Sequence, residues 1–362
     1  MKKHTLYKKI ALLILVLVSY SIQSQEIVTK KIEKTFKMTN AGELHLDNKY
    51  GNVIISGWEE NKASVVIDIK VNNKKKENAK ALIDRIIADI KNAGDFVSIT
   101  SEISEKNTSF FSRYFNKVNP FEFDKSNVEI NYKIYLPINA EIDVTNKFGD
   151  IVIDNWTGKL KANLEHGDLW LNDAVSNANI IMKFGKLRAK SIIYGTVNIK
   201  NGDIDIENSK NLLLKTSGSN IEINTVTNLE LYSSKDEIAI EYVGDITGEL
   251  SFSKVTAQNV EDKISLLMSV ADLRVFKINQ SDAMVDINQE SSDIHINITG
   301  LSFKFNATLE QGLLRLPKTF SNVKSKVINK SERLREITAN YGNLKKGVFS
   351  FAGKKGVIVL NE

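Results

Sequence analysis

Gly149-Asp-Ile-Val-Ile opens a series of similar phrases that continues with Gly167-Asp-Leu-Trp-Leu, Gly185-Lys-Leu-Arg-Ala and Gly202-Asp-Ile-Asp-Ile, and then with Asn220-Ile-Glu-Ile and Glu237-Ile-Ala-Ile. The first aliphatic residues form a ladder with steps of 18, 18, 17, 17 and 17 residues: Ile151, Leu169, Leu187, Ile204, Ile221 and Ile238. Apolar and polar residues alternate inside each phrase, which is typical of a strand with one buried face. A fixed period just under 20 residues predicts a β-solenoid, whose turns stack the same inward side chains.

A second ladder accompanies the first and passes through Leu160, Ala178, Leu212, Leu229, Leu266, Val285 and Phe303. Each turn is therefore expected to hold at least two strands joined by short bends. The first ladder continues less regularly at Val255, Leu273, Ile294 and Leu314, which indicates distorted turns. Residues 347–351 and 356–360 are predicted closing strands. The fold class is thus mainly β: residues 140–362 form a single-stranded parallel β-solenoid, right-handed by the preference of parallel crossovers.

The N-terminal residues 25–139 contain a distant copy of the same phrase. Leu44 to Trp58 aligns without a gap on Ile142 to Trp156, and both segments share the pattern Asn-Lys-aromatic-Gly. The first copy is therefore expected to belong to the same solenoid, with the intervening residues forming a small α+β cap.

An amphipathic helix is predicted over residues 76–92 within this cap. Its apolar residues recur at three- and four-residue spacing, and they are Ala79, Leu82, Ile83, Ile86, Ile87 and Ile90. Gly94 is expected to end the helix. Covering one end of the solenoid is preferred over binding a partner helix. An aromatic loop over residues 104–127 follows, and its rings are expected to fold back onto the cap, with contact to a membrane or a protein as the alternative.

Residues 1–24 are predicted to be a secretory signal, because four lysines precede the apolar run Ile10 to Val18. That run is too short for a membrane span. Removing the four lysines changes the balance from 49 basic and 44 acidic residues to 45 and 44, so the formal charge falls from +5 to +1. A nucleic-acid partner loses its main support. The chain has no cysteine, which excludes a lipobox anchor and disulfides in this sequence.

A ligand-contact face is predicted on the outward residues of three neighbouring turns: Asp168, Trp170, Lys186, Arg188, Asp203 and Asp205. Such residues can stack on a sugar and hydrogen-bond to it. Outward positions of any solenoid are polar, however, and the same alternation explains Asp203, Asp205 and Glu207 better than a calcium site does. His45, His166 and His295 have no second ligand at metal spacing. The sequence therefore predicts no catalytic residue, metal or cofactor.

An extended strand ending in proline leads into the repeats, in the stretch Val128-Glu-Ile-Asn-Tyr-Lys-Ile-Tyr-Leu-Pro-Ile-Asn-Ala-Glu-Ile-Asp-Val-Thr-Asn-Lys-Phe-Gly-Asp-Ile. In this Tyr-x-Ile-x-x-Pro strand and the Gly-Asp-Ile phrases after it, the chain resembles the putative adhesin family of exported bacterial proteins. That family is related to the head domain of auto-transporter-like adhesins. The resemblance covers most of the mature chain and implies a β-helical fold and an envelope location, with no catalytic residues to carry over.

The leading functional hypothesis is a non-enzymatic exported protein of the cell envelope, in the periplasm or at the cell surface, that binds a glycan or an envelope protein. A carbohydrate-active β-helix enzyme of the polysaccharide lyase or hydrolase kind is the alternative, because solenoids also host such enzymes. A sensor partner in the envelope is the third. A glycine-rich phosphate loop and a Gly-x-Ser-x-Gly elbow are both absent from the sequence.

Overall fold

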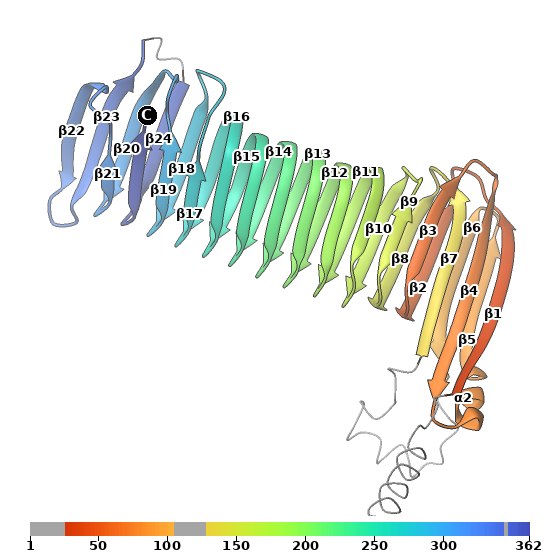
Figure 1. Ribbon diagram of the computed structural model, residues 1–362. Helices are drawn as coiled ribbons and strands as arrows, with labels where there is room; N and C mark the ends of the chain where they lie inside the picture. The colour runs from red at the N-terminus through yellow and green to blue at the C-terminus, as the bar shows by residue number, and fades with distance from the viewer. Residues whose placement is uncertain (1–25, 105–127, 344–346) are drawn as a thin grey trace, which may run out of the picture.

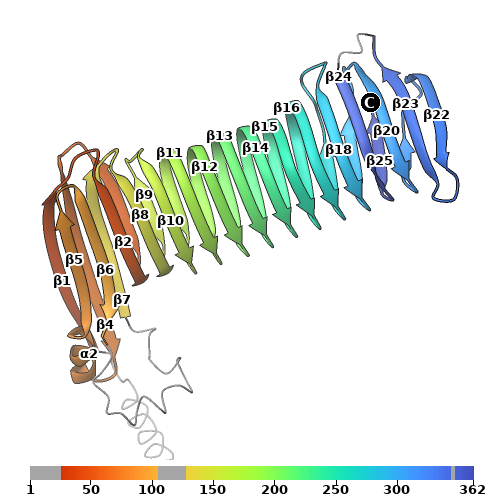
Figure 2. The same cartoon turned by 180° about the vertical axis from the view of Figure 1, so that it is seen from behind.

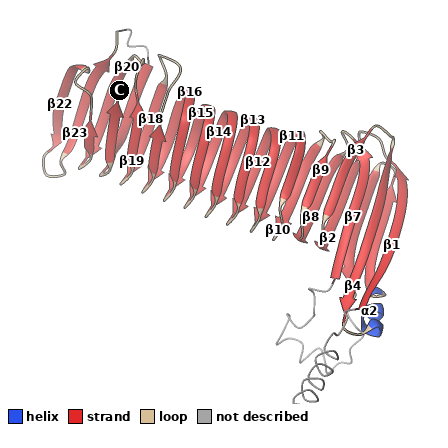
Figure 3. Ribbon diagram, in the orientation of Figure 1, coloured by secondary structure: helices blue, strands red, loops and turns tan. Residues whose placement is uncertain are grey.

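The chain forms an elongated stack of strands with a short helix at its N-terminal end (Figures 1 and 3). The computed structural model describes residues 26–104, 128–343 and 347–362. The predicted signal segment 1–24 and residues 105–127 of the aromatic loop lie outside the described residues. Within the described part, no helix is both long and apolar enough to cross a bilayer.

Six long strands make up the middle of the stack. They are β11 (Leu169–Lys183), β12 (Lys186–Lys200), β13 (Asp203–Ser217), β14 (Asn220–Ser234), β15 (Glu237–Ser251) and β16 (Lys254–Ser269). Each pairs in parallel with the next, and the register joins Leu169 to Leu187, Leu187 to Ile204, and Ile204 to Ile221. These partners are the rungs of the predicted ladder. The arrangement is solenoid-like, while the handedness of the coil stays a prediction.

Every long strand bends once, so that each turn contributes two arms. In β13 the first arm buries Ile204 and Ile206, the second buries Leu212 and Leu214, and pairing with β14 skips Glu207 and Lys210 between them. We call the first arms and the strands in line with them the first layer, and the second arms with theirs the second layer. Inward residues of both layers belong to one hydrophobic core. Each fully buried aliphatic side chain contributes roughly 1.5–3 kcal/mol.

The N-terminal copy of the phrase lies inside the stack. It forms β2 (Glu43–Tyr50) and β3 (Val53–Trp58), which pair in parallel with β8 (Glu141–Phe148) and β9 (Ile151–Asp154). Leu44 faces Ile142 and Val53 faces Ile151, so the gap-free alignment is confirmed as the register. On their other sides β2 and β3 pair with β6 (Phe96–Ile103) and β7 (Val128–Pro137). The next turn begins with β10 (Lys159–Glu165), which joins β8 to β11.

Antiparallel strands close this end of the stack. β1 (Glu26–Lys37) pairs with β4 (Lys62–Asn73), and β4 pairs with β7. The predicted helix is shorter than expected: α2 covers only Lys76–Ile83 and packs against β1 and β4 through Ala79 and Ile83. Residues 86–93 form β5 (Ile86–Ala93), an antiparallel partner of β6. Ile86, Ala88 and Ile90 also fit a two-residue period, and pairing along β6 outweighs their helical spacing. Gly94, at φ +62°, lies in the hairpin loop.

At the C-terminal end the chain first continues the stack with four shorter strands. They are β17 (Asp272–Val275), β18 (Met284–Glu290), β19 (Asp293–Asn297) and β20 (Phe303–Glu310), followed by β21 (Leu313–Arg315). An antiparallel hairpin of β22 (Ser321–Asn329) and β23 (Leu334–Tyr341) comes next. The last strands are β24 (Gly347–Lys354) and β25 (Val357–Asn361).

The predicted closing strands do not close the stack. β24 pairs in parallel with β18 and β20, and β25 pairs with β19 and β21, so the last turn lies between two earlier ones. Phe349 therefore separates Val285 from Phe303 in the second ladder. The rung after Ile246 is Ile264 rather than the predicted Leu266. The outermost strands of the second layer are β23 and β22 (Figures 1 and 2).

The corners between turns are built from very small residues. A Cβ on Gly167 or Gly185 would lie 2.0 Å from the carbonyl oxygen of the glycine one turn earlier, so neither position accepts a larger residue without a shift. Further along the stack this corner position holds Ser219, Asp236 and Ser253, all buried. The corner therefore changes from close-packed glycine to a hydrogen-bonded polar interior.

Candidate functional site

The six predicted site residues lie side by side on the outer surface of the first layer. Trp170, Arg188 and Asp205 occupy paired positions on three successive turns, and Lys186 is paired with Asp203 in the row beside them. Asp168 joins that second row, because its Oδ1 accepts a hydrogen bond from the Lys186 backbone N–H at 2.8 Å. We call these six residues the charged face. Its grouping follows from the alternation that buries the intervening aliphatic residues.

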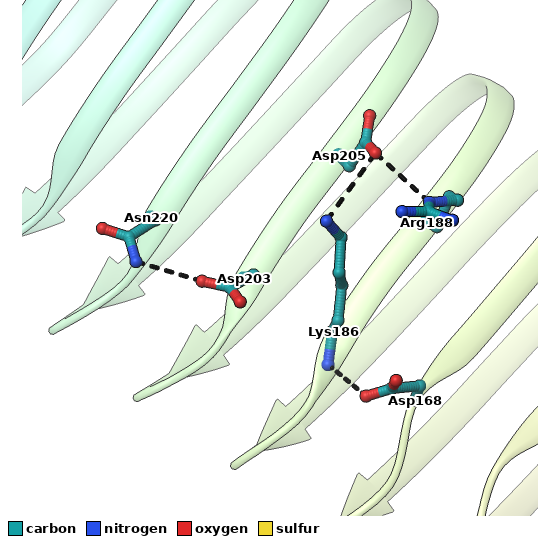
Figure 4. Close-up of polar contacts among 6 residues, drawn as sticks. All are labelled: Asp168, Lys186, Arg188, Asp203, Asp205 and Asn220. Carbon is teal, nitrogen blue, oxygen red and sulfur yellow. Dashed lines mark hydrogen bonds and ion pairs between the residues drawn. The ribbon is translucent and has the colours of Figure 1, made fainter.

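Asp205 is the centre of the ion pairs on the charged face. Its Oδ2 lies 3.2 Å from Arg188 Nε and 3.8 Å from Lys186 Nζ (Figure 4). The Arg188 guanidinium carbon also lies 4.6 Å from the centroid of the Trp170 ring, in a cation–π contact. One face of the tryptophan is thus covered by arginine, which leaves less of the ring available as a platform for a ligand.

The other two carboxylates have structural partners. Asp203 Oδ1 accepts a hydrogen bond from Asn220 Nδ2 at 3.1 Å (Figure 4). Asp168 belongs to a row in which each side-chain oxygen accepts the backbone N–H of the next turn: its own N–H donates to Asp150 Oδ1 at 2.9 Å, and that of Asp150 donates to Asn52 Oδ1 at 2.9 Å. The aspartate of the Gly-Asp phrase therefore braces the start of each strand.

The three histidines outside the predicted signal lie apart from one another. His45 Nδ1 is 3.7 Å from Asp143 Oδ2. The His166 ring is stacked between Phe148 and Phe184, with centroid distances of 5.3 and 4.8 Å. His295 lies on β19 beside Arg274 of β17. Within residues 26–104, 128–343 and 347–362, no group of three or more histidine or acidic side chains is arranged to hold a metal ion.

The second layer carries a hollow that the sequence analysis did not identify. It has a volume of about 660 Å³ and lies over the outer surface from β11 to β16. Its signal was present in the sequence: Asn211 and Asn228 are one 17-residue period apart and each precedes a rung of the second ladder. The hollow faces away from the charged face, because it lies on the second arms of the turns and not on the first.

Known proteins offer limited comparisons. No family model and no curated protein matches the chain. Similar solved structures include a "putative cell adhesion protein" from Clostridium sporogenes, with 13% identity, a TM-score of 0.20, and coverage of 92% of this chain and 98% of that one. A "putative adhesin" from Bacteroides fragilis has 11% identity, a TM-score of 0.24 and coverage of 91% and 97%. A "putative lipid binding protein" from Parabacteroides distasonis has 12%, 0.30, 73% and 93%. At these TM-scores the likenesses carry no conclusion about this chain.

Proposed function

We propose that this chain is a non-enzymatic, exported protein of the cell envelope, an adhesin-like right-handed β-solenoid that binds a glycan or an envelope protein. Export is supported by the lysine-led apolar run of residues 1–24, and the adhesin character by the resemblance of residues 128–151. A rigid stack of parallel turns holds surface side chains at fixed spacing, which suits recognition of an extended ligand.

One observation carries the choice of binding over catalysis. The carboxylates of the charged face, on Asp168, Asp203 and Asp205, each accept a hydrogen bond or an ion pair from a neighbouring turn. A general acid or base must be within reach of a substrate proton. Here the carboxylate oxygens serve the next strand instead, so the face is better suited to holding a ligand than to moving protons.

The charged face supplies the contacts expected for such a ligand. Lys186 and Arg188 offer N–H donors, and the open face of Trp170 offers apolar area. A polysaccharide lyase or hydrolase on the same face is the alternative function, since acids and a base lie together there. A sensor partner in the envelope is a third function with the same contacts.

A glycan array run beside a depolymerisation assay tests binding against catalysis. We expect binding without shortening of any polysaccharide, and unchanged binding partners when Asp203 and Asp205 are both replaced by Asn. Degradation by the parent protein that is lost in the double variant would establish the enzyme instead.

Export has its own test. The protein recovered from the envelope fraction should begin at Gln25 or within a few residues of it, as measured by intact mass. Recovery of the full-length chain from the cytosol would contradict export, whatever the ligand.

A further inference from the structure

The hollow of the second layer has a floor of unusually small residues. At the corresponding rung of the second ladder, β13 and β14 carry Leu212 and Leu229, whereas β11 and β12 carry Ala178 and Gly195. All four line the hollow of about 660 Å³. Because Ala178 and Gly195 lack the bulk of leucine, the outer surface is lower over these turns. We call this hollow the second-layer groove.

A single row of polar side chains follows the groove from turn to turn. Its members occupy paired positions on six successive turns and are Asn177, Tyr194, Asn211, Asn228, Asp245 and Lys263. Neighbouring strands are about 4.8 Å apart, so the row extends for about 24 Å along the stack. A ligand that contacts the whole row must therefore be an extended chain lying parallel to the long axis of the protein.

The chemistry of the row is that of a site for hydroxyl groups. Asn228 Nδ2 donates to Asn211 Oδ1 at 2.6 Å, which orients both amides. An amide pair of this kind still presents N–H donors and a carbonyl acceptor outward. Tyr194 is 41% exposed and adds an aromatic ring. Asp245 is paired in register with Lys263, so opposite charges adjoin at one end of the groove. The row favours a neutral, polyhydroxylated chain over a polyanion.

A peptide strand fits this surface less well than a glycan does. Each strand from β12 to β15 already pairs with a neighbour on both sides, so no backbone edge is open beneath the groove. An added β-strand needs such an edge for its main-chain hydrogen bonds. Only side chains are offered here, and amides with a tyrosine ring complement the alternating hydroxyl and C–H surfaces of sugars.

We propose that the second-layer groove binds a neutral polysaccharide chain along the axis of the stack, with Tyr194, Asn211 and Asn228 as its main contacts. This deepens the binding function proposed above, but places the chain on the opposite layer from the charged face. The two surfaces can therefore be tested separately.

The experiment is affinity electrophoresis of the mature chain in gels containing mannan, mixed-linkage β-glucan or xyloglucan, with alginate as an anionic comparison. We expect at least one neutral polysaccharide to retard the protein more than alginate does. The double variant Asn211→Ala/Asn228→Ala and the single variant Tyr194→Ala should each weaken retardation at least ten-fold. Thr196→Trp, which fills the groove without removing a polar contact, should abolish it. Circular dichroism and urea melts verify that each variant folds.

Variants of the charged face are the matched controls. Trp170→Ala and Arg188→Ala should bind within two-fold of the parent. Loss of binding in these controls, with the groove variants unaffected, would overturn the groove site and leave the proposed binding function standing. Failure of every neutral polysaccharide to retard the parent would also overturn it. Shortening of the retained polysaccharide would instead contradict the non-enzymatic function while leaving the groove in place.

Discussion

The side-chain amide of Asn48 donates a hydrogen bond to Asn146 Oδ1 over 3.1 Å, although 98 residues separate the two in the chain. Both side chains are fully buried. Asn146 Nδ2 also donates to the carbonyls of Gly51 and Gly149 at 2.9 and 2.8 Å. In the next turn the paired position is Leu164. The repeated Asn-Lys-aromatic-Gly pattern is thus a pair of corner braces that binds the first turn to the next one along the stack.

Replacing Asn146 by Ala should destabilise the protein strongly. The variant removes two donors from buried corner carbonyls and one acceptor from Asn48, and unpaired buried groups cost about 1–3 kcal/mol each. We expect a loss of roughly 3 kcal/mol in the free energy of unfolding, measured by urea melts. Asn163→Ala, at an exposed position of β10, is the control and should stay within about 0.5 kcal/mol. Equal effects at the two positions would contradict the bracing role.

The ladder predicts opposite responses from adjacent residues. Ile204 is 1% exposed, so Ile204→Asp loses burial worth roughly 1.5–3 kcal/mol and also places an unpaired carboxylate in the core. Asp203→Thr should cost within about 0.5 kcal/mol, as is usual for a surface position. Urea melts measure the difference. Hydrogen exchange should show that Ile204→Asp opens neighbouring turns before the whole chain unfolds, and uniform opening of all turns would contradict a stack stabilised by nearest neighbours.

Asp236 should be the most sensitive acidic residue of the stack. It is 4% exposed and its carboxylate accepts hydrogen bonds from the hydroxyls of Thr216 and Ser233 and from two backbone N–H groups. Asp236→Ala leaves these donors without an acceptor, and we expect a loss of about 3 kcal/mol or more. Glu237→Ala removes an exposed pair with Lys254 and should cost less than about 1 kcal/mol. Comparable losses in the two variants would show that the polar corner is not a buried network.

Alkaline pH should destabilise the C-terminal end through Tyr341. Burial raises the pKa of this hydroxyl to about 12, and Glu362, which accepts its hydrogen bond at 2.9 Å, raises it further in the same direction. The unfolded chain loses the proton near pH 10, so stability is complete below that pH and declines as pH rises from about 10 towards 12. Burial also raises the pKa of Tyr132 to about 12. Tyr341→Phe should therefore give a shallower decline in urea melts between pH 8 and 11.5, and an unchanged slope would contradict this assignment.

The sequence was sufficient to predict which residues stack wherever the partner lies one period away. Leu187 and Ile204 are paired as the 17-residue step requires, and that step also brings the charged face together. Even the offset of 98 residues between Leu44 and Ile142 was readable, because the shared asparagine, aromatic and glycine each have a partner in the corner.

Other features depended on competition between distant partners. Ile86 and Ile90 satisfy both a helical and a strand period, and only the presence of β6 decides between them. The slot of β24 between β18 and β20 has no counterpart in local pattern, since Phe349 would fit any rung of the ladder. The second-layer groove was missed because Gly195 is a rung without a side chain, and an aliphatic pattern passes over it.

The positions of β2–β3 and β24–β25 inside the stack have a consequence for how the length of the molecule can change. Both end assemblies are tied together by segments far apart in the chain, whereas β12 to β15 contact only the turns before and after them. Removing one central period of 17 residues should therefore leave both ends intact. It would shorten the protein by a single strand spacing, about 4.8 Å. The molecule is in this sense a ruler graduated in turns, with its two ends fixed and its middle open to extension.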